Sequence, residues 1–238
     1  MDDLDATVRR ADPDRWLASR FVAGQVARAD LIALYAFNHE LARATEAARE
    51  PLVQEIRLTW WREALDEVFA GRPPRRHPVV EALAETIRRR ALTPAPFEAT
   101  IEARIEAIDT PAPADEAAVH RHIDATAGAL MGLAATILDP TMSAVATRPA
   151  ARAWGLAGLA RLRRTGVDRL PKAWDDAEIR RRVRSAMTDA RVAARQLPVA
   201  AFPAIAYATL ANTYAAGRTP SDLEKRLRLT TAVLTGRL

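Results

Sequence analysis

Apolar residues recur at helical spacing along almost the whole chain, and almost no segment alternates between apolar and polar positions as a β-strand would. The stretch 31–46, for example, places Leu34, Tyr35 and Leu41 on this spacing. Connections rich in proline separate the periodic segments, and they have the length of loops rather than of linkers between domains. The pattern therefore predicts an all-α fold of about ten helices that forms a single domain over residues 1–238.

Capping residues, prolines and glycines set the expected ends of these helices. The first helix is short and follows Asp12-Pro13, and the others cover 31–46, 51–71, 78–91, 96–109, 115–138, 148–164, 175–196, 199–216 and 221–234. We expect Asp30 to cap the second helix, His77 to act as a cap or turn residue, and Ser221 to open a capping box with Glu224. The segment 125–138 is almost entirely small or apolar, which predicts a helix in the middle of the protein.

Composition excludes several classes of site. The chain has no cysteine, so disulfides, zinc–thiolate centres and cysteine nucleophiles are ruled out. No apolar run reaches the roughly 18 residues that a membrane span needs. The segment MDDLDATVRR is acidic and polar, which is not typical of a secretory signal, so we expect a cytoplasmic location.

The basic residues are unevenly distributed. The net charge is +5, and the stretch 161–195 holds 11 basic residues against 5 acidic ones. Such a stretch is either the solvated face of amphipathic helices or a surface for diphosphate or an anionic membrane. Aromatic residues make up 5% of the chain and are not interleaved with arginine, so we expect no nucleic acid partner.

Five motifs follow one another between residues 14 and 171. They are DRWLASRFV (14–22), ALYAFNHELARATE (33–46), RLTWWREALDEVFAGRPPRRHPVVEAL (57–83), ATAGALMG (125–132) and WGLAGLARLRR with the later RLP (154–171). In this order they resemble the squalene/phytoene synthase family, and the run from Trp-Trp-Arg to His-Pro is the most specific of them. The resemblance implies an isoprenoid-synthase-like bundle of helices around a central cavity.

The resemblance also implies two acidic motifs on facing helices, and the chain departs from both. Enzymes of the family join two prenyl diphosphates and hold the diphosphate through Mg²⁺, which prefers carboxylate oxygens and neutralises the leaving group. An alignment on Tyr35 places the first motif at Ala42, Arg43 and Glu46, so one carboxylate remains. The second motif falls between Gly155 and Pro171, where Asp168 is the only acid. We therefore expect no metal ligand, no cofactor and no catalytic residue.

Five residues remain candidates for binding a substrate-like ligand. Tyr35 and Asn38 are expected to line the cavity, and Glu46 is the acid that survives in the first motif. Arg161 and Arg164 could bind a diphosphate directly, because a guanidinium presents a planar fork of donors to phosphate oxygens. For each residue there is a structural alternative: Tyr35 as a core residue, Glu46 as an exposed acid at a helix end, and the arginines as a solvated helix face.

Two functions follow from the resemblance. The segment Phe37-Asn38-His39-Glu40-Leu41, together with the retained Trp-Trp helix, resembles the respiratory complex I assembly factors of mitochondria and their bacterial relatives. That likeness implies a non-catalytic protein that binds a protein partner or an isoprenoid-like lipid, peripherally at an anionic membrane surface on the inner face. The alternative is an active head-to-head prenyltransferase that depends on Mg²⁺. No feature of the sequence indicates an oligomeric state.

Overall fold

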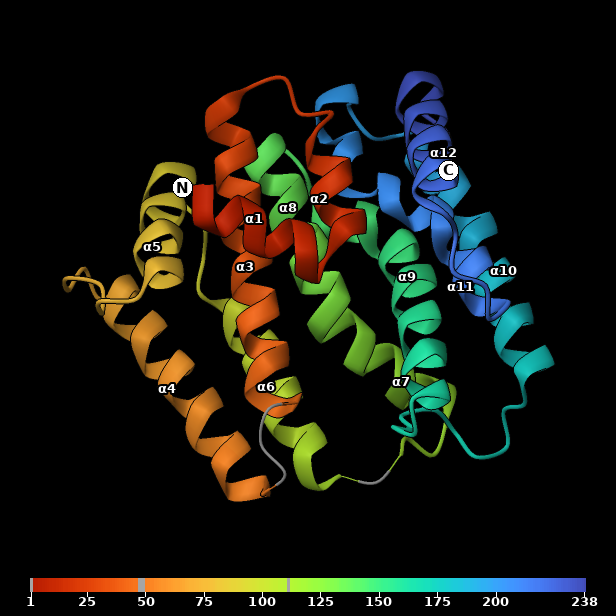
Figure 1. The fold of residues 1–238 in the computed structure, drawn as a ribbon, viewed down its shortest axis with the longest axis horizontal. Coiled ribbons are helices and arrows are strands. Elements are labelled where there is room, and N and C mark those ends of the chain that lie inside the picture. The colour runs from red at the N-terminus through yellow and green to blue at the C-terminus, as the bar shows by residue number, and fades with distance from the viewer. Residues whose placement is uncertain (1, 47–49, 111) are drawn as a thin grey trace. The chain divides into compact units, whose positions relative to one another are not determined.

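The computed structural model describes residues 2–46, 50–110 and 112–238, and within these ranges the chain is helical without any β-strand (Figure 1). The predicted all-α class is therefore confirmed. Contacts divide the chain into two compact units, residues 1–110 and 111–238, and each is described by itself. The single domain over the whole chain stays a prediction.

The first unit is built around one long helix. The described residues of this unit form α1 (Asp2–Ala11), α2 (Pro13–Ser19), α3 (Gln25–Glu46), α4 (Pro51–Phe69), α5 (Pro78–Arg90) and α6 (Ala95–Asp109). Each of the other five contacts α3. Eight consecutive residues of α3, from Asp30 to Phe37, are buried, which shows that all sides of the helix are covered.

The turn before α5 confirms the prediction that His77 is a cap or turn residue. His77 is the N-cap of α5, and its Nδ1 accepts a hydrogen bond of 3.2 Å from the Val79 N–H. The His77 ring also packs edge-on against both Trp60 and Trp61, at 5.6 and 5.2 Å between centroids. Trp61 is 4% exposed. Trp61 therefore forms part of the core, and Trp60 is half-buried beside it.

The start of α3 is a correction. The sequence predicts a helix that begins after Asp30, but α3 begins at Gln25 and Asp30 lies within it, 1% exposed. The Asp30 carboxylate accepts hydrogen bonds from Arg89 and Arg90 of α5 instead of capping its own helix. A second difference is α1, which the sequence analysis did not predict at all.

The second unit is built around α9. Its elements are α7 (Glu116–Ile123), a π-helical turn (Asp124–Gly128), α8 (Ala129–Leu138), α9 (Ala144–Arg164), α10 (Asp176–Ala194), two 3-10 segments (Val199–Ala204 and Ala206–Leu210), α11 (Ala211–Ala215) and α12 (Asp222–Thr235). Contacts join α9 to α7, α8, α10 and α11. Seven of the ten residues of α8 are buried, which confirms the prediction for this apolar segment.

Two expected helices of this unit differ from the structure, and a third keeps its expected bounds without the full capping box. The helix predicted from residue 148 begins at Ala144, because Ser143 caps it and Pro149 is accommodated inside it. The helix predicted over 199–216 is mostly 3-10, since Pro203 has no N–H to continue an α-helical ladder. Ser221 caps α12 as predicted, but the carboxylate of Glu224 pairs with Arg218 and does not complete the capping box.

Candidate functional site

A half-buried polar pair joins α3 to α6. The Asn38 Oδ1 accepts a hydrogen bond of 2.9 Å from Nη2 of Arg104. The other terminal nitrogen of this guanidinium, Nη1, is buried and has no hydrogen-bond partner among the described residues. The structure thus places Asn38, a predicted ligand-binding residue, in contact with the Arg104 guanidinium, which keeps one N–H donor group without an acceptor in the described residues.

The surroundings of this pair carry more positive than negative charge. Burial lowers the pKa of Arg104 to about 10, and repulsion from Arg15 of α2 acts in the same direction. Attraction to Glu46 opposes both effects. A buried cation lowers the energy of an anion near it, so this interior favours an anionic group over a metal cation.

Tyr35 lies in the same part of the first unit. Its side chain is 1% exposed, and the guanidinium carbon of Arg15 is 6.0 Å from the ring centroid. Arg15 is itself held by Asp12, through a contact of 2.5 Å between Nη1 and Oδ2. The structure therefore brings Tyr35, Asn38 and the two arginines together, with the tyrosine forming part of the core.

The positions of the first acidic motif do not form a magnesium site. Ala42 has no ligand atom, and Arg43 forms an ion pair of 2.8 Å with Glu40. Glu46 is exposed in the last turn of α3, which leaves one carboxylate where the resemblance implies several. Within the described ranges, no three acidic or imidazole side chains are close enough to hold a metal ion together. This donor set does not fit Mg²⁺.

The region of the second acidic motif is held by an arginine. Arg163 donates to Asp168 Oδ1 at 2.8 Å, to the Trp174 carbonyl at 2.5 Å and to the Pro171 carbonyl at 3.1 Å. Burial would raise the pKa of Asp168, but the Arg163 guanidinium and the Leu170 N–H outweigh it, so this pKa lies below its ordinary value. The one acid of the region therefore has a structural partner.

Arg161 and Arg164, the other two predicted ligand-binding residues, lie in the second unit near Tyr214. Arg164 donates to the main-chain carbonyls of Tyr214 and Ala215, each at 2.9 Å, and so satisfies the end of α11. The guanidinium of Arg161 lies 4.4 Å from the centroid of the Tyr214 ring and 5.6 Å from that of Trp154. Both arginines are thus in contact with their own unit, and their role as diphosphate ligands stays a prediction.

Arg104 is not among the binding residues predicted from the sequence. A signal was present, because α6 carries Phe97, Ile101 and Ile108 at helical spacing and Arg104 falls on the same stripe. A charged residue on an apolar stripe requires a polar partner inside the protein, and here that partner is Asn38.

The curated relatives found by sequence share a name. An NADH dehydrogenase (ubiquinone) complex I assembly factor 6 from Bos taurus is 27% identical over 131 residues, which is 55% of this chain and 39% of that protein. The protein of the same name from Homo sapiens is 24% identical over a stretch of the same length. The matched part of this chain thus spans well under half the length of either relative.

Comparison with solved structures gives the fold. A dehydrosqualene synthase solved in complex with a ligand has a TM-score of 0.80 at 14% identity, covering 98% of this chain and 95% of that one. A squalene synthase from Alicyclobacillus acidocaldarius has a TM-score of 0.71 at 17% identity, covering 99% of this chain and 93% of that one. Among the helices of the described residues, none combines the length and apolar character needed to cross a membrane.

The family assignment rests on the sequence model of squalene/phytoene synthase, which matches residues 8–164. This range covers well over half of the chain and includes the segments from the Trp-Trp helix to the end of α9. The chain belongs to the squalene/phytoene synthase family.

Proposed function

We propose that this chain is a non-catalytic member of its family that acts as a binding protein in the assembly of a respiratory complex. The observation that carries the proposal is the first motif, where Ala42 and the ion-paired Arg43 stand in place of metal-binding carboxylates. Without bound Mg²⁺, nothing in this motif neutralises a departing diphosphate, and the ionisation step that prenyl transfer requires is not assisted.

The interior around Asn38 supports a binding role. Arg104 keeps a buried donor without a partner in the described residues, and Arg15 lies close enough to repel its charge. These guanidinium groups suit the anionic end of an isoprenoid-like lipid or a carboxylate of a protein partner, and neither ligand requires a metal.

The assembly role is supported by the relatives, whose printed names describe complex I assembly factors. We propose that this chain assists the same respiratory complex, as a peripheral protein on the inner face of the membrane.

The first experiment measures turnover. The full chain is incubated with farnesyl or geranylgeranyl diphosphate and Mg²⁺, and the extracted hydrocarbons are analysed by gas chromatography. We expect no squalene, phytoene or related product above a reaction without protein. Formation of such a product, and its loss in the Glu46→Ala variant, would show that the chain is an active prenyltransferase.

The second experiment measures the cellular role. The gene is deleted in its source organism, and NADH:ubiquinone oxidoreductase activity is measured together with the cellular content of squalene and phytoene. We expect the oxidoreductase activity to fall and the hydrocarbons to stay constant, with both the wild-type gene and Glu46→Ala restoring activity. The opposite result, normal oxidoreductase activity with missing hydrocarbons, would contradict the proposal.

A further inference from the structure

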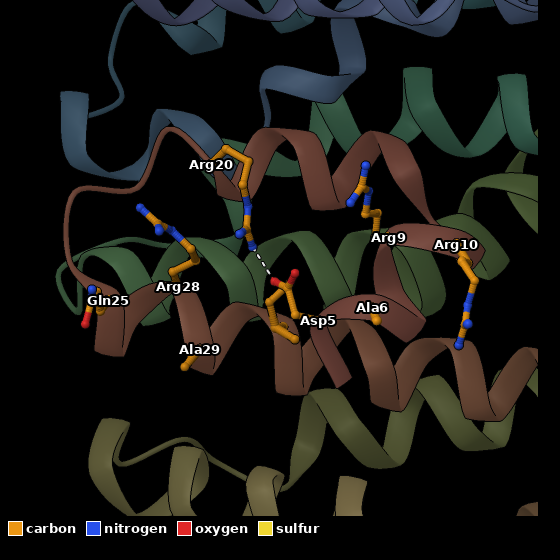
Figure 2. Close-up of a pocket in the computed structure, with 9 residues that line it drawn as sticks. Asp5, Ala6, Arg9, Arg10, Arg20, Gln25, Arg28 and Ala29 are labelled. Carbon is orange, nitrogen blue, oxygen red and sulfur yellow. Dashed lines mark hydrogen bonds and ion pairs between the residues drawn. The ribbon is translucent and has the colours of Figure 1, made fainter. Parts of the chain in front are cut away.

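An arginine-lined hollow of about 730 Å³ opens on the surface of the first unit, between α1, the end of α2 and the start of α3 (Figure 2). Figure 2 shows arginines from all three helices around it, with one carboxylate, that of Asp5, between them. The nine lining residues are Asp5, Ala6, Arg9, Arg10, Arg20, Gln25, Arg28, Ala29 and Ile32. Among these described lining residues, four cations and one anion give a formal charge of +3.

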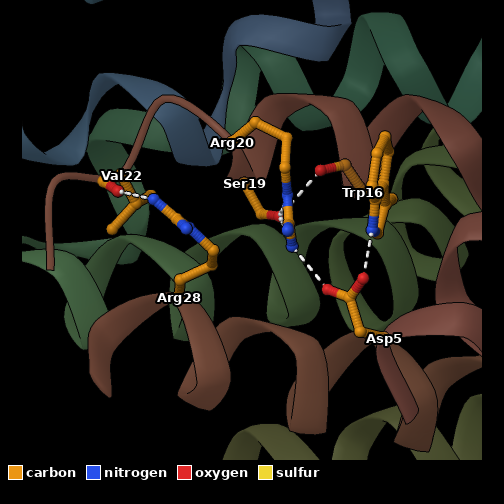
Figure 3. A network of polar contacts seen from close by, with 6 residues as sticks. All are labelled: Asp5, Trp16, Ser19, Arg20, Val22 and Arg28. Carbon is orange, nitrogen blue, oxygen red and sulfur yellow. Dashed lines mark hydrogen bonds and ion pairs between the residues drawn. The ribbon is translucent and has the colours of Figure 1, made fainter. Parts of the chain in front are cut away.

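One side of the hollow is held rigidly by a polar network (Figure 3). Asp5 accepts a hydrogen bond of 3.0 Å from the Trp16 indole and one of 2.6 Å from Arg20. Arg20 also donates to Ser19, whose hydroxyl donates to the Trp16 carbonyl at 2.7 Å. The Asp5 carboxylate is therefore shared between two donors, and among the described lining residues it pairs with Arg20 alone of the four arginines.

The remaining arginines keep donors for a ligand. Arg9 and Arg10 are exposed, and neither forms a hydrogen bond or ion pair with another residue that the structure describes. Arg9 instead lies over the Trp16 ring, at 5.0 Å from its centroid. Arg28 uses Nη2 to bind the Val22 carbonyl at 2.8 Å, but its Nε is buried and has no partner in the described part of the chain.

We propose that this hollow is a binding site for a phosphate group, carried either by a soluble phosphate ester or by the headgroup of an anionic lipid. Arginine binds phosphate oxygens with parallel hydrogen bonds, and several guanidinium groups around one volume match the charge of a phosphate or diphosphate. The apolar part of the lining consists of Ala6, Ala29 and Ile32, which is too small to hold an isoprenoid chain. The ligand is therefore recognised by its anionic group.

This inference goes beyond the proposed function. It concerns residues outside the acidic motif and outside the pair formed by Asn38 and Arg104, and it holds whether or not the chain catalyses prenyl transfer. Failure of the phosphate site would leave the turnover and gene-deletion tests unaffected.

The test titrates inorganic diphosphate into the full chain by isothermal calorimetry at low salt. We expect one saturable site, weakened about tenfold or more in the Arg9→Gln/Arg10→Gln double variant and about tenfold in Arg28→Gln. Asp5→Asn removes the opposing charge and is expected to bind diphosphate more tightly than the wild type. The matched control is Arg88→Gln, which removes an exposed arginine of α5 that does not line the hollow.

A second arm identifies the source of the phosphate by cosedimentation with phosphatidylglycerol or phosphatidylcholine vesicles. If diphosphate binds, and the hollow variants weaken this binding while Arg88→Gln does not, the result supports a soluble phosphate as the ligand. Binding of phosphatidylglycerol vesicles alone, with the same pattern among the variants, supports a lipid headgroup. The proposal is overturned if neither ligand binds, if the hollow variants bind as well as the wild type, or if Arg88→Gln weakens binding as much as they do. Circular dichroism confirms that each variant is folded.

Discussion

Two regions of this protein are rich in arginine, and they use it differently. In the stretch 161–195 of the second unit, arginines are tied to their own unit: Arg163 holds a loop, Arg164 satisfies the end of α11 and Arg182 pairs with Glu116 and Glu178. In the hollow of the first unit, Arg9 and Arg10 have no such partner among the described residues.

The difference shows that charge along the sequence does not measure charge available to a ligand. The stretch 161–195 has the higher density of basic residues, yet structural contacts occupy several of them. The four arginines of the hollow come from α1, the C-cap of α2 and α3, within residues 9–28, where basic residues are less dense than in the stretch 161–195. An arginine is available for binding when the fold leaves its donors without acceptors.

The largest expected loss of stability comes from substituting Asp30, whose carboxylate neutralises an arginine cluster of the first unit. Asp30 is 1% exposed and binds Arg89, Arg90 and Thr86. Asp30→Ala removes the buried carboxylate. It leaves Arg90 without an ion-pair partner among the described residues and Arg89 with only the exposed Glu85 at 3.6 Å, which should lower the free energy of unfolding by about 3 kcal/mol. Urea denaturation followed by circular dichroism measures the loss. A loss below about 0.5 kcal/mol would show that this cluster contributes as little as an exposed pair.

A smaller loss is expected at Arg163. Its side chain is 20% exposed and donates to one carboxylate and two main-chain carbonyls. Arg163→Ala should therefore cost about 2 kcal/mol of unfolding free energy, since several charge-assisted hydrogen bonds are lost. Arg184→Ala is the matched control, because Arg184 is exposed in the same stretch. Equal urea midpoints for the two variants would contradict the structural role assigned to Arg163.

A pH effect of still smaller size is expected at His120 of α7. Burial lowers its pKa below the ordinary value of 6.5, repulsion from Arg152 adds to this, and Glu116 and Asp124 oppose it. The unfolded chain therefore binds the proton more tightly, so stability is lost as the pH falls through 6.5 toward the folded pKa. Urea midpoints at pH 7.5 and about pH 5 test this. His120→Gln should reduce the difference between them, and an unchanged difference would assign it to other groups.

The smallest effect on stability is expected in the hollow itself. Arg9→Gln/Arg10→Gln removes two exposed guanidinium groups that have no hydrogen bond in the described residues, so the free energy of unfolding should change by less than about 0.5 kcal/mol. The same variant is expected to lose diphosphate binding. A large loss of stability would show that these arginines are structural, like Arg163, and would remove the contrast between the two regions.

Local signals predicted much of the fold. His77 and Ser221 each cap the helix that the sequence assigned to them, through hydrogen bonds within three residues of the cap. Asp30 carries the same local signal, but its partners are Arg89 and Arg90, about 60 residues away. The capping propensity of a residue is judged from its neighbours in sequence, and it does not reveal a partner that is distant in sequence. For this reason the predicted start of α3 was wrong.

The candidate site was likewise predictable where the signal is local and unpredictable where the contact joins distant residues. The loss of the acidic motif could be seen from Ala42 and Arg43, because the family resemblance fixes which side chains stand at those positions. The contact between Asn38 and Arg104 joins residues 66 positions apart, so spacing along one helix could not give it. The sequence thus indicated what is missing from the site better than it indicated what the site contains.

The most direct test of the account is a calorimetric titration of Mg²⁺ into the full chain saturated with farnesyl thiodiphosphate, an analogue whose diphosphate leaves with difficulty. The account predicts no heat beyond that of Mg²⁺ binding to the analogue alone, since Ala42 and Arg43 supply no oxygen ligand. A saturable set of Mg²⁺ ions bound per chain, and lost in Glu46→Ala, would contradict it.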